Sequence, residues 1–396
     1  HQSNNQDIQI MKYNISKLFV GAVAMASLTL LGACNNAEYS PLSNQAYIAQ
    51  TNTNGNSSQN ITIGTSAVTS SVNVRLSDPA TQDYTFEIVA DTTALAEYNQ
   101  RNETSYKALP ANLYSLSSNE VTIENGKSVS SEVTLTINPL TQALKDSGLK
   151  YAVALRLKSK DGKYDVLNSG STMVYVLDQV VYQAVPIVNS THNIHFAMRQ
   201  SYNLSQWTVE MNVNISKLGK ALGELNNQTL FGAWGNDGGE IYTRFGDAPI
   251  EGNRLQIKTQ GTQMNSKQLF NENQWYHLAF VCTGTKLYLY VNGVLDNSMD
   301  LPGKTTNLSN TFNFGNTDYL KANVKVSELR FWTVARTQAQ IANNMYACDA
   351  KSTDLEAYWK LNEGQGDTFK DATGHNNTGK CVAVPTWEQN VRIDGK

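Results

Sequence analysis

The sequence predicts an all-β protein made of two successive β-domains. Between Ser71 and Leu157, three stretches alternate apolar and polar side chains with a period of two, which is the pattern of half-buried strands. Their spacing is typical of an immunoglobulin-like β-sandwich. A second series of strand-like stretches fills residues 186–396. Helical patterns are short and few, so the strands define the fold class.

The N-terminus carries a signal for export and lipid attachment. After Lys12 and Lys17, the fourteen residues Leu18–Leu31 are uncharged, which is the length of a signal-peptide core and too short for a comfortable bilayer span. The run leads through Gly32-Ala33 to Cys34 and resembles the bacterial lipobox, whose cysteine is diacylated and becomes the mature N-terminus. Two or three acyl chains would anchor the protein stably. The alternative is an ordinary secretory signal in which the cysteine is incidental.

Bulk composition excludes several classes of function. About 360 of the 396 residues follow Cys34, enough for two domains of ordinary size. The net charge is −3 and no basic stripe occurs, which argues against a nucleic-acid partner. Only 16% of the residues are charged, and such a surface suits neutral, hydroxyl-rich ligands. Lipid attachment would use one of the four cysteines, and the other three, Cys282, Cys348 and Cys381, allow one bridge or buried thiols.

Composition divides the chain into four segments. Residues 1–33 form an upstream extension and the signal peptide, and residues 34–60 begin with the lipidated cysteine and continue as a polar, flexible tether. Residues 61–182 form the immunoglobulin-like domain and residues 186–396 form the second β-domain. Because no second apolar run of membrane-spanning length follows the signal, we expect lipids rather than a helix to hold the protein at a membrane.

Two short helices interrupt the strands of the first domain. Asp91 is a good N-cap for one of them. Asn138 and Pro139 provide a cap and a first-turn proline for a helix over residues 140–144, and Gly148 lies near its end. The strands are predicted at residues 71–76, 132–137 and 151–157.

The first domain also carries a specific series of short motifs. In order, they are Ala94–Asn99, Tyr106–Pro110, Tyr114–Leu116 and Val121–Lys127. This series resembles the N-terminal domain of unknown function in surface lipoproteins of Bacteroides and its relatives, which also precedes some endo-β-N-acetylglucosaminidase modules. The resemblance covers roughly residues 40–180 and implies a spacing or docking role without catalytic residues.

The second domain combines strand motifs with two clear local signals. Asn292-Gly293 predicts a type I′ turn, and Thr337 with Gln340 predicts a capping box at the start of a helix. The strand motifs are residues 206–213, 274–281, 286–291, 328–332 and 358–364, followed by the loop 371–379. In this order and spacing they resemble the laminin-G-like, concanavalin-type jelly roll of carbohydrate-binding proteins. The resemblance implies a jelly roll over nearly the whole C-terminal half.

The same jelly roll also hosts glycosidases, so their carboxylates are a test for catalysis. Enzymes of this fold use Glu-x-Asp-x-(x)-Glu on one strand, where the period of two places the acids on one face. No glutamate here begins such a motif, and neither Gly-x-Ser-x-Gly nor a glycine-rich phosphate loop occurs. The chain also has no room for a catalytic barrel of about 250 residues. We therefore expect a protein that is not an enzyme.

Candidate metal ligands are sparse. His192 and His195 lie three residues apart, which on a strand points them to opposite faces, and His277 is expected to be a hydrogen-bonded structural residue. Asp371 begins a loop of the kind that domains of this fold use to hold calcium through oxygen ligands. The same Asp-x-Thr-Gly-x-Asn pattern also forms turns through local side-chain bonds. Both roles, a calcium ligand and a turn former, are open for Asp371.

One glycine-rich loop combines the groups that sugar recognition needs. A flat aromatic ring covers the apolar face of a pyranose, and amides, carboxylates or a guanidinium pair with its hydroxyls. The alternative is that Trp234 only anchors this loop on the sheet, whereas Trp207, Trp275, Trp332 and Trp359 lie at strand positions and are expected to be core residues. The candidate glycan-binding residues are Trp234, Asn236, Asp237, Tyr242 and Arg244, with a second cluster of Asn316, Asp318 and Tyr319.

The expected function is capture of oligosaccharides at a bacterial surface. The two resemblances imply an outer-membrane lipoprotein that faces outward and is similar to the surface glycan-binding proteins of Sus-type uptake systems. Such proteins pass oligosaccharides to a TonB-dependent transporter with a lipoprotein lid. High-mannose N-glycans are the first ligand to expect, because the first domain type accompanies endo-β-N-acetylglucosaminidases. The alternative is a structural or adhesion lipoprotein that binds a protein partner or the transporter complex.

Overall fold

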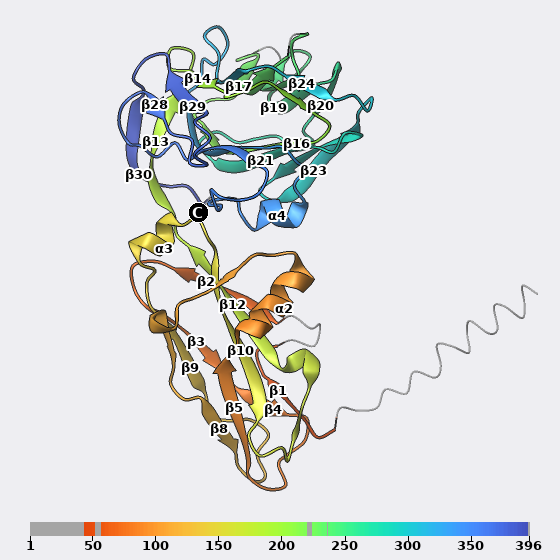
Figure 1. Cartoon of the computed structure of the whole chain (residues 1–396), viewed down its shortest axis with the longest axis vertical. Coiled ribbons are helices and arrows are strands. Elements are labelled where there is room, and N and C mark those ends of the chain that lie inside the picture. Colours follow the sequence, from red (N-terminus) through yellow and green to blue (C-terminus); the bar gives the residue numbers. More distant parts are fainter. Residues whose placement is uncertain (1–42, 52–56, 220–223, 236, 395–396) are drawn as a thin grey trace, which may run out of the picture.

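The computed structural model describes residues 43–51, 57–219, 224–235 and 237–394. The signal peptide, Cys34 and part of the predicted tether lie outside the described residues. Figure 1 shows the chain up to about residue 180 as one domain and the rest as a second domain stacked on its end. Within the described ranges, no helix is both long enough and apolar enough to cross a bilayer.

The N-terminal domain is built mainly from strands in three sheets of the described chain. Its elements are β1 (Gln45–Ile48), β2 (Ser58–Ile63), β3 (Val68–Val72), β4 (Val74–Leu76), β5 (Tyr84–Ala90), α2 (Thr92–Asn102), β6 (Lys107–Ala108), η1 (Ala111–Leu113), β7 (Tyr114–Leu116), β8 (Glu120–Ile123), β9 (Val133–Ile137), α3 (Gln142–Asp146), β10 (Tyr151–Ser159), β11 (Asp165–Val166), η2 (Asn168–Gly170) and β12 (Thr172–Gln179). The largest sheet has the order β2-β12-β10-β5-β8, and the others have the orders β11-β1-β4 and β3-β9-β7.

The central strand β10 shows why this domain has two apolar layers. Val153 and Leu155 belong to the main core between the sheets, whereas Ala152 and Ala154 point to the opposite face. On that face the buried side of α2 covers the sheet, so β10 is apolar on both sides.

The C-terminal domain is a sandwich of two eight-stranded sheets. Its elements are β13 (Tyr182–Val188), β14 (Ile194–Ala197), β15 (Tyr202–Leu204), β16 (Trp207–Ile215), β17 (Gln228–Trp234), β18 (Ile241–Asp247), β19 (Ile250–Thr259), β20 (Thr262–Asn265), β21 (Trp275–Cys282), β22 (Lys286–Val291), β23 (Val294–Asp300), β24 (Thr306–Leu308), β25 (Thr311–Phe314), β26 (Val324–Trp332), α4 (Gln338–Ala342), β27 (Leu355–Trp359), β28 (Thr368–Phe369), β29 (Thr378–Cys381) and β30 (Thr386–Arg392). One sheet has the order β23-β22-β21-β16-β26-β13-β30, with β27 paired to β26, and the other has the order β20-β19-β18-β17-β25-β14-β29-β28.

The sheet that contains β16 faces the N-terminal domain, and the sheet that contains β17 lies on the far side of the sandwich (Figure 1). We call them the near sheet and the far sheet. Every residue of β16 is buried, because Val209 and Met211 point into the core while Asn212 points toward the segment after α4 and donates to the Met345 carbonyl at 3.0 Å. The near sheet is therefore covered on both faces.

Several local predictions are confirmed. Asp91 caps α2 by accepting from the backbone N–H groups of Thr93 and Ala94. Asn292 and Gly293 both have positive φ, as a type I′ turn requires. The capping box of Thr337 and Gln340 is present at α4.

Other local predictions need correction. The second short helix covers Gln142–Asp146 instead of residues 140–144, because Thr141 rather than Asn138 is its N-cap and Leu140 is buried in the core. The strand predicted at 71–76 is broken into β3 and β4. Part of the predicted tether is also ordered, since Gln45–Ile48 forms β1 and buries Ala46 and Ile48 completely. Buried and partly exposed side chains alternate over these four residues, and this pattern is enough for the segment to join a sheet as a strand.

The tryptophans and cysteines follow the prediction with one difference. Trp207, Trp332 and Trp359 are fully buried, whereas Trp275 is only half-buried at the start of β21. Cys282, Cys348 and Cys381 are free thiols buried in the C-terminal domain, so of the two alternatives the structure shows buried thiols.

Candidate functional site

The far sheet places three of the predicted residues on its outward face. Alternate residues of β18 belong to the core, so Tyr242 and Arg244 point outward. Tyr242 pairs across the strands with Gly232 of β17, and Gly232 pairs with Asn313 of β25. Residues paired in this way share one face. We call the outward residues Trp234, Tyr242, Arg244, Gln256 and Asn313 the Trp234 face.

The indole of Trp234 lies against Gly232. A Cβ atom at residue 232 would be 3.0 Å from the indole Nε1, so the absence of a side chain there makes room for the ring. Nε1 donates a hydrogen bond to Oδ1 of Asn313 at 2.9 Å. The ring centroid is 5.1 Å from that of Tyr242. Trp234 is half-buried, so part of an oriented aromatic ring remains open to solvent.

Beneath this ring, Tyr242 is held by hydrogen bonds at its hydroxyl. The hydroxyl lies 2.6 Å from that of Thr229 and donates to Oδ1 of Asn227 at 2.8 Å. Burial raises the pKa of Tyr242, and the nearby phenol of Tyr319 contributes to this rise. The tyrosine is therefore a neutral, fixed support for the tryptophan.

The guanidinium of Arg244 is buried and engaged within the protein. Its Nε and Nη2 donate to Oε1 of Gln256 at 3.0 and 2.6 Å, its Nη1 donates to Asn227 at 2.9 Å, and its Nη2 also pairs with Asp247. Its central carbon lies 5.1 Å from the ring centroid of Tyr242. The sequence suggested a group that pairs with sugar hydroxyls, but the burial of Arg244 makes it a support for the platform.

The loop after Trp234 contains a carboxyl pair. Asn236 lies outside the described residues, Asp237 is exposed, and Glu240 is buried. Burial and a hydrogen bond with Asp237 raise the pKa of Glu240 to about 7, and the same bond lowers the pKa of Asp237. Glu240 therefore carries a proton below about pH 7, and in that form it can donate a hydrogen bond to Asp237.

The second predicted cluster lies beside the first. Tyr319 is 44% exposed, and its carbonyl accepts a hydrogen bond from Nε2 of Gln228 on β17 at 2.8 Å. Asn316 uses its side-chain oxygen to accept from the backbone N–H of Asp318 at 2.8 Å, which is a turn-forming contact. Asp318 is exposed. The tertiary structure thus brings Tyr319 toward Tyr242, although the two residues come from separate parts of the chain.

Asp371 acts as a turn former. Its carboxylate accepts from the backbone N–H groups of Tyr358, Thr373 and Asn377 and from the side chains of Thr373 and Asn377, at 2.7–3.2 Å. Five donors from the protein occupy the oxygens that a calcium ion would need. Of the two roles left open by the sequence, the structure supports the turn. Across the described residues, no group of three or more histidine, cysteine or acidic side chains is arranged to hold a metal ion.

The three histidines considered as metal ligands occupy different environments. His195 is exposed and pairs across the strands with Asn313, so it extends the outward row of the far sheet. The ring of His192 contacts Asn189 and Thr191 within a turn. His277 was predicted to be a hydrogen-bonded structural residue; it is buried, but its ring makes no hydrogen bond with the described residues, and its Nε2 lies 3.5 Å from Glu210.

Sequence reasoning missed the polar supports of the Trp234 face. Asn313, Gln256 and Asn227 bind Trp234 or Arg244 directly, yet each lies on a strand or turn with no unusual local pattern. Strand register alone brings them to the site. Glu240 carried a weak signal, since it lies in the same glycine-rich loop as Asp237.

Two family models match the chain. Residues 42–163 match a family described as an N-terminal domain, and residues 189–342 match the concanavalin A-like lectin/glucanases superfamily. No curated protein matches the chain.

Two solved structures are among those similar to this chain. A candidate carbohydrate-binding protein from Bacteroides ovatus is 23% identical with a TM-score of 0.56, and the match covers 88% of this chain and 99% of that one. A heptameric SAP-like pentraxin from Limulus polyphemus is 13% identical with a TM-score of 0.37, covering 54% of this chain and 96% of that one. At 23% identity the likeness to the Bacteroides ovatus protein is one of fold. The chain thus joins an N-terminal domain similar to the first family to a C-terminal domain similar to the concanavalin A-like lectin/glucanases superfamily.

Proposed function

We propose that the C-terminal domain binds oligosaccharides at the Trp234 face and does not cleave them. The observation that carries this proposal is the half-buried indole of Trp234, which Asn313 and Tyr242 hold in one orientation at the surface. An oriented aromatic ring offers contact area to a pyranose at a low entropic cost, because the ring is already immobile before binding. The lectin-like fold of the domain agrees with this role.

Polar groups around the ring supply the second half of sugar recognition. Asp237, in the loop after Trp234, and Tyr319, near Tyr242, are exposed and carry acceptor and donor groups for hydroxyls. Arg244 acts indirectly in this proposal, by fixing Tyr242 and Asn227. Trp234 is therefore the contact residue and Arg244 is a positioning residue.

The position of the face suits presentation at a cell surface. The far sheet lies on the side of the sandwich that points away from the N-terminal domain, and the chain enters at that first domain (Figure 1). We infer that lipids on Cys34 anchor the protein to the outer membrane and that the first domain raises the Trp234 face outward. In this arrangement the protein would deliver oligosaccharides to a Sus-type transporter and its lipoprotein lid. High-mannose N-glycans are the first ligand to test.

A glycan array on a soluble fragment that begins after Cys34 tests the proposal. We expect the wild type to bind a defined set of oligosaccharides and Trp234→Ala to lose that set. Incubation of the same fragment with those ligands should produce no new reducing ends. Turnover that copurifies with the protein would overturn the non-catalytic assignment, and a flat array would favour a structural or adhesion role instead.

A further inference from the structure

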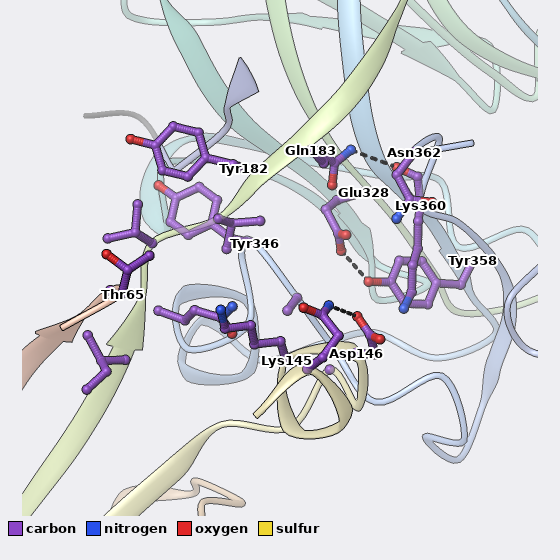
Figure 2. A pocket seen from close by; sticks show the side chains of 18 residues that line it. Thr65, Lys145, Asp146, Tyr182, Gln183, Glu328, Tyr346, Tyr358, Lys360 and Asn362 are labelled. Atoms are coloured by element: carbon purple, nitrogen blue, oxygen red, sulfur yellow. Dashed lines mark hydrogen bonds between the residues drawn. The ribbon is translucent and has the colours of Figure 1, made fainter. Parts of the chain in front are cut away.

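A cavity of about 300 Å³ lies between the two domains and is lined by both (Figure 2). Four parts of the chain form its walls: the end of β2 around Thr65 and α3 in the N-terminal domain, the connection around Tyr182 and Gln183, and the strands β26 and β27 with the segment around Tyr346. Pockets at domain junctions are frequent sites for small ligands. The far sheet and Trp234 take no part in this cavity.

Direct backbone contact sets the distance between the cavity walls. Gly148, after α3, has a φ of +69°, and a Cβ atom there would be 2.1 Å from the carbonyl oxygen of Cys348 in the other domain. Nearby, the hydroxyl of Tyr106 donates to Oδ1 of Asn343 across the junction at 3.3 Å. Only glycine permits this approach, so residue 148 allows the two domains to touch beside the cavity.

Two lysines from opposite domains line the cavity without an acidic partner. Lys145 comes from α3 and Lys360 follows β27, and within the described ranges neither ammonium has a carboxylate at ion-pair distance. A neighbouring lysine differs, since Lys150 pairs with Asp178 at 2.8 Å. The ammonium of Lys360 lies instead 5.7 Å from the ring centroid of Tyr358.

The two acids on the cavity wall already have partners. Glu328 accepts from the hydroxyl of Tyr358 and pairs with the guanidinium of Arg330. Asp146 accepts from Nε2 of Gln142 at 2.8 Å. Arg330 compensates the charge of Glu328, whereas the neutral amide of Gln142 leaves that of Asp146 uncompensated. Two lysines against one such carboxylate leave the cavity with a net positive charge.

Aromatic and amide groups complete the lining. Figure 2 shows Tyr182 and Tyr346 on one side of the cavity and Lys360 and Asn362 on the other, with Lys145 between the two sides in this view. Tyr182 is 54% exposed, so its ring is accessible from solvent. Rings, amides and two free ammonium groups are the combination that suits a pyranose with a negative substituent.

We propose that this junction is a second ligand site, which binds an acidic sugar through Lys145 and Lys360. The carboxylate or sulfate of the sugar lies between the two ammonium groups, and the pyranose ring lies toward the tyrosines. The site is distinct from the Trp234 face and extends the range of ligands from neutral to acidic sugars. A ligand bound there would contact both domains, because Lys145 belongs to one domain and Lys360 to the other.

Titration calorimetry with three monosaccharides tests the proposal: methyl glucuronide, glucose 6-sulfate and methyl glucoside. We expect at least one acidic sugar to bind about tenfold or more tightly than the glucoside, and added salt to reduce the difference. Lys145→Ala and Lys360→Ala should each remove most of the preference. Lys158→Ala, at an exposed position outside the cavity, should retain it. Comparison of the affinities for methyl glucuronide and glucose 6-sulfate shows whether the site prefers a carboxylate or a sulfate.

The Trp234→Ala variant separates this site from the proposed function. It should bind the acidic sugar normally, whatever happens to oligosaccharide binding at the far sheet. Equal affinity for all three sugars, no binding of either acidic sugar, or full binding by a folded double lysine variant would overturn the proposal. Gly148→Val, which would push the domains apart, should also lose acidic-sugar binding while each domain keeps its β-sheet circular dichroism.

Discussion

The indole nitrogen of Trp234 donates to the side-chain oxygen of Asn313 at 2.9 Å, across the paired strands β17 and β25. Gly232 lies between them without a side chain, so the ring can reach across its own strand. The orientation of the exposed aromatic ring therefore depends on strand register and on one glycine, and both can be tested.

Replacing Trp234 with alanine should abolish most glycan binding. An aromatic anchor typically contributes about 2 kcal/mol or more, which corresponds to about a thirtyfold loss of affinity measured by calorimetry. The thermal midpoint should change little, because the ring is half-buried. Trp359→Ala is the matched control. The centroid of this fully buried ring lies 4.0 Å from that of Phe196, and the loss of the ring should cost about 3–5 kcal/mol of stability. Normal binding by a folded Trp234→Ala protein would move the site elsewhere.

Gly232→Val should weaken glycan binding while Trp234 is still present. The new side chain begins 3.0 Å from the indole Nε1 and displaces the ring, and we expect about a tenfold loss of affinity. In a Trp234→Ala background the same change should cost no further affinity. Gly64→Ala, where a Cβ atom has no neighbour within 4 Å, serves as the control. Additive losses in the double variant would show that Gly232 acts independently of the indole.

Glu240 should make stability depend on pH. Burial and Asp237 raise its pKa from 4.5 to about 7, so the folded state binds this proton more tightly than the unfolded state does. The contribution of the protonated Glu240 to the stability of the folded state is fully present below about pH 4.5 and is lost as the pH rises through about 7. Urea unfolding of the wild type and Glu240→Gln at pH 5 and pH 8 isolates this effect, since the glutamine cannot ionise. An identical pH dependence in both proteins would refute it.

Asp371→Ala should destabilise the C-terminal domain without any involvement of calcium. The substitution leaves the buried N–H groups of Tyr358 and Asn377 without their acceptor, at a cost of about 3 kcal/mol in denaturant unfolding. A chelator should leave the thermal midpoint of the wild type unchanged. A midpoint that rises with added calcium in the wild type, but not in Asp371→Ala, would restore the calcium role.

Cys34→Ala should release the protein from membranes. The thiol is the proposed attachment point for fatty acids, and without it the cell should secrete or retain a soluble form. Labelling with a radioactive or clickable fatty acid, followed by membrane fractionation, measures both effects. Cys348→Ala, at a buried thiol, should still be labelled. Continued labelling of the Cys34→Ala protein would show that the lipid is attached elsewhere.

Local pattern was enough for most of the fold. Alternation with a period of two predicted β9 and β22, because one side of each strand must pack on the core. The turn at Asn292-Gly293 and the cap at Asp91 depend on a few adjacent residues, so they too were predictable. The break between β3 and β4 and the start of α3 at Thr141 were not, because pairing with neighbouring strands and burial of Leu140 decide them.

The sequence by itself determined that residues close along the chain meet across one hairpin. Trp234 and Tyr242 come together in this way, because β17 and β18 are consecutive antiparallel strands. Only the tertiary structure decided what each one does. Asn313 reaches Trp234 through the register of β25, and Arg244 is buried because Asn227, Asp247 and Gln256 surround it. Long-range packing sets exposure and partners, whereas residue type and spacing set only the direction of a side chain from its strand.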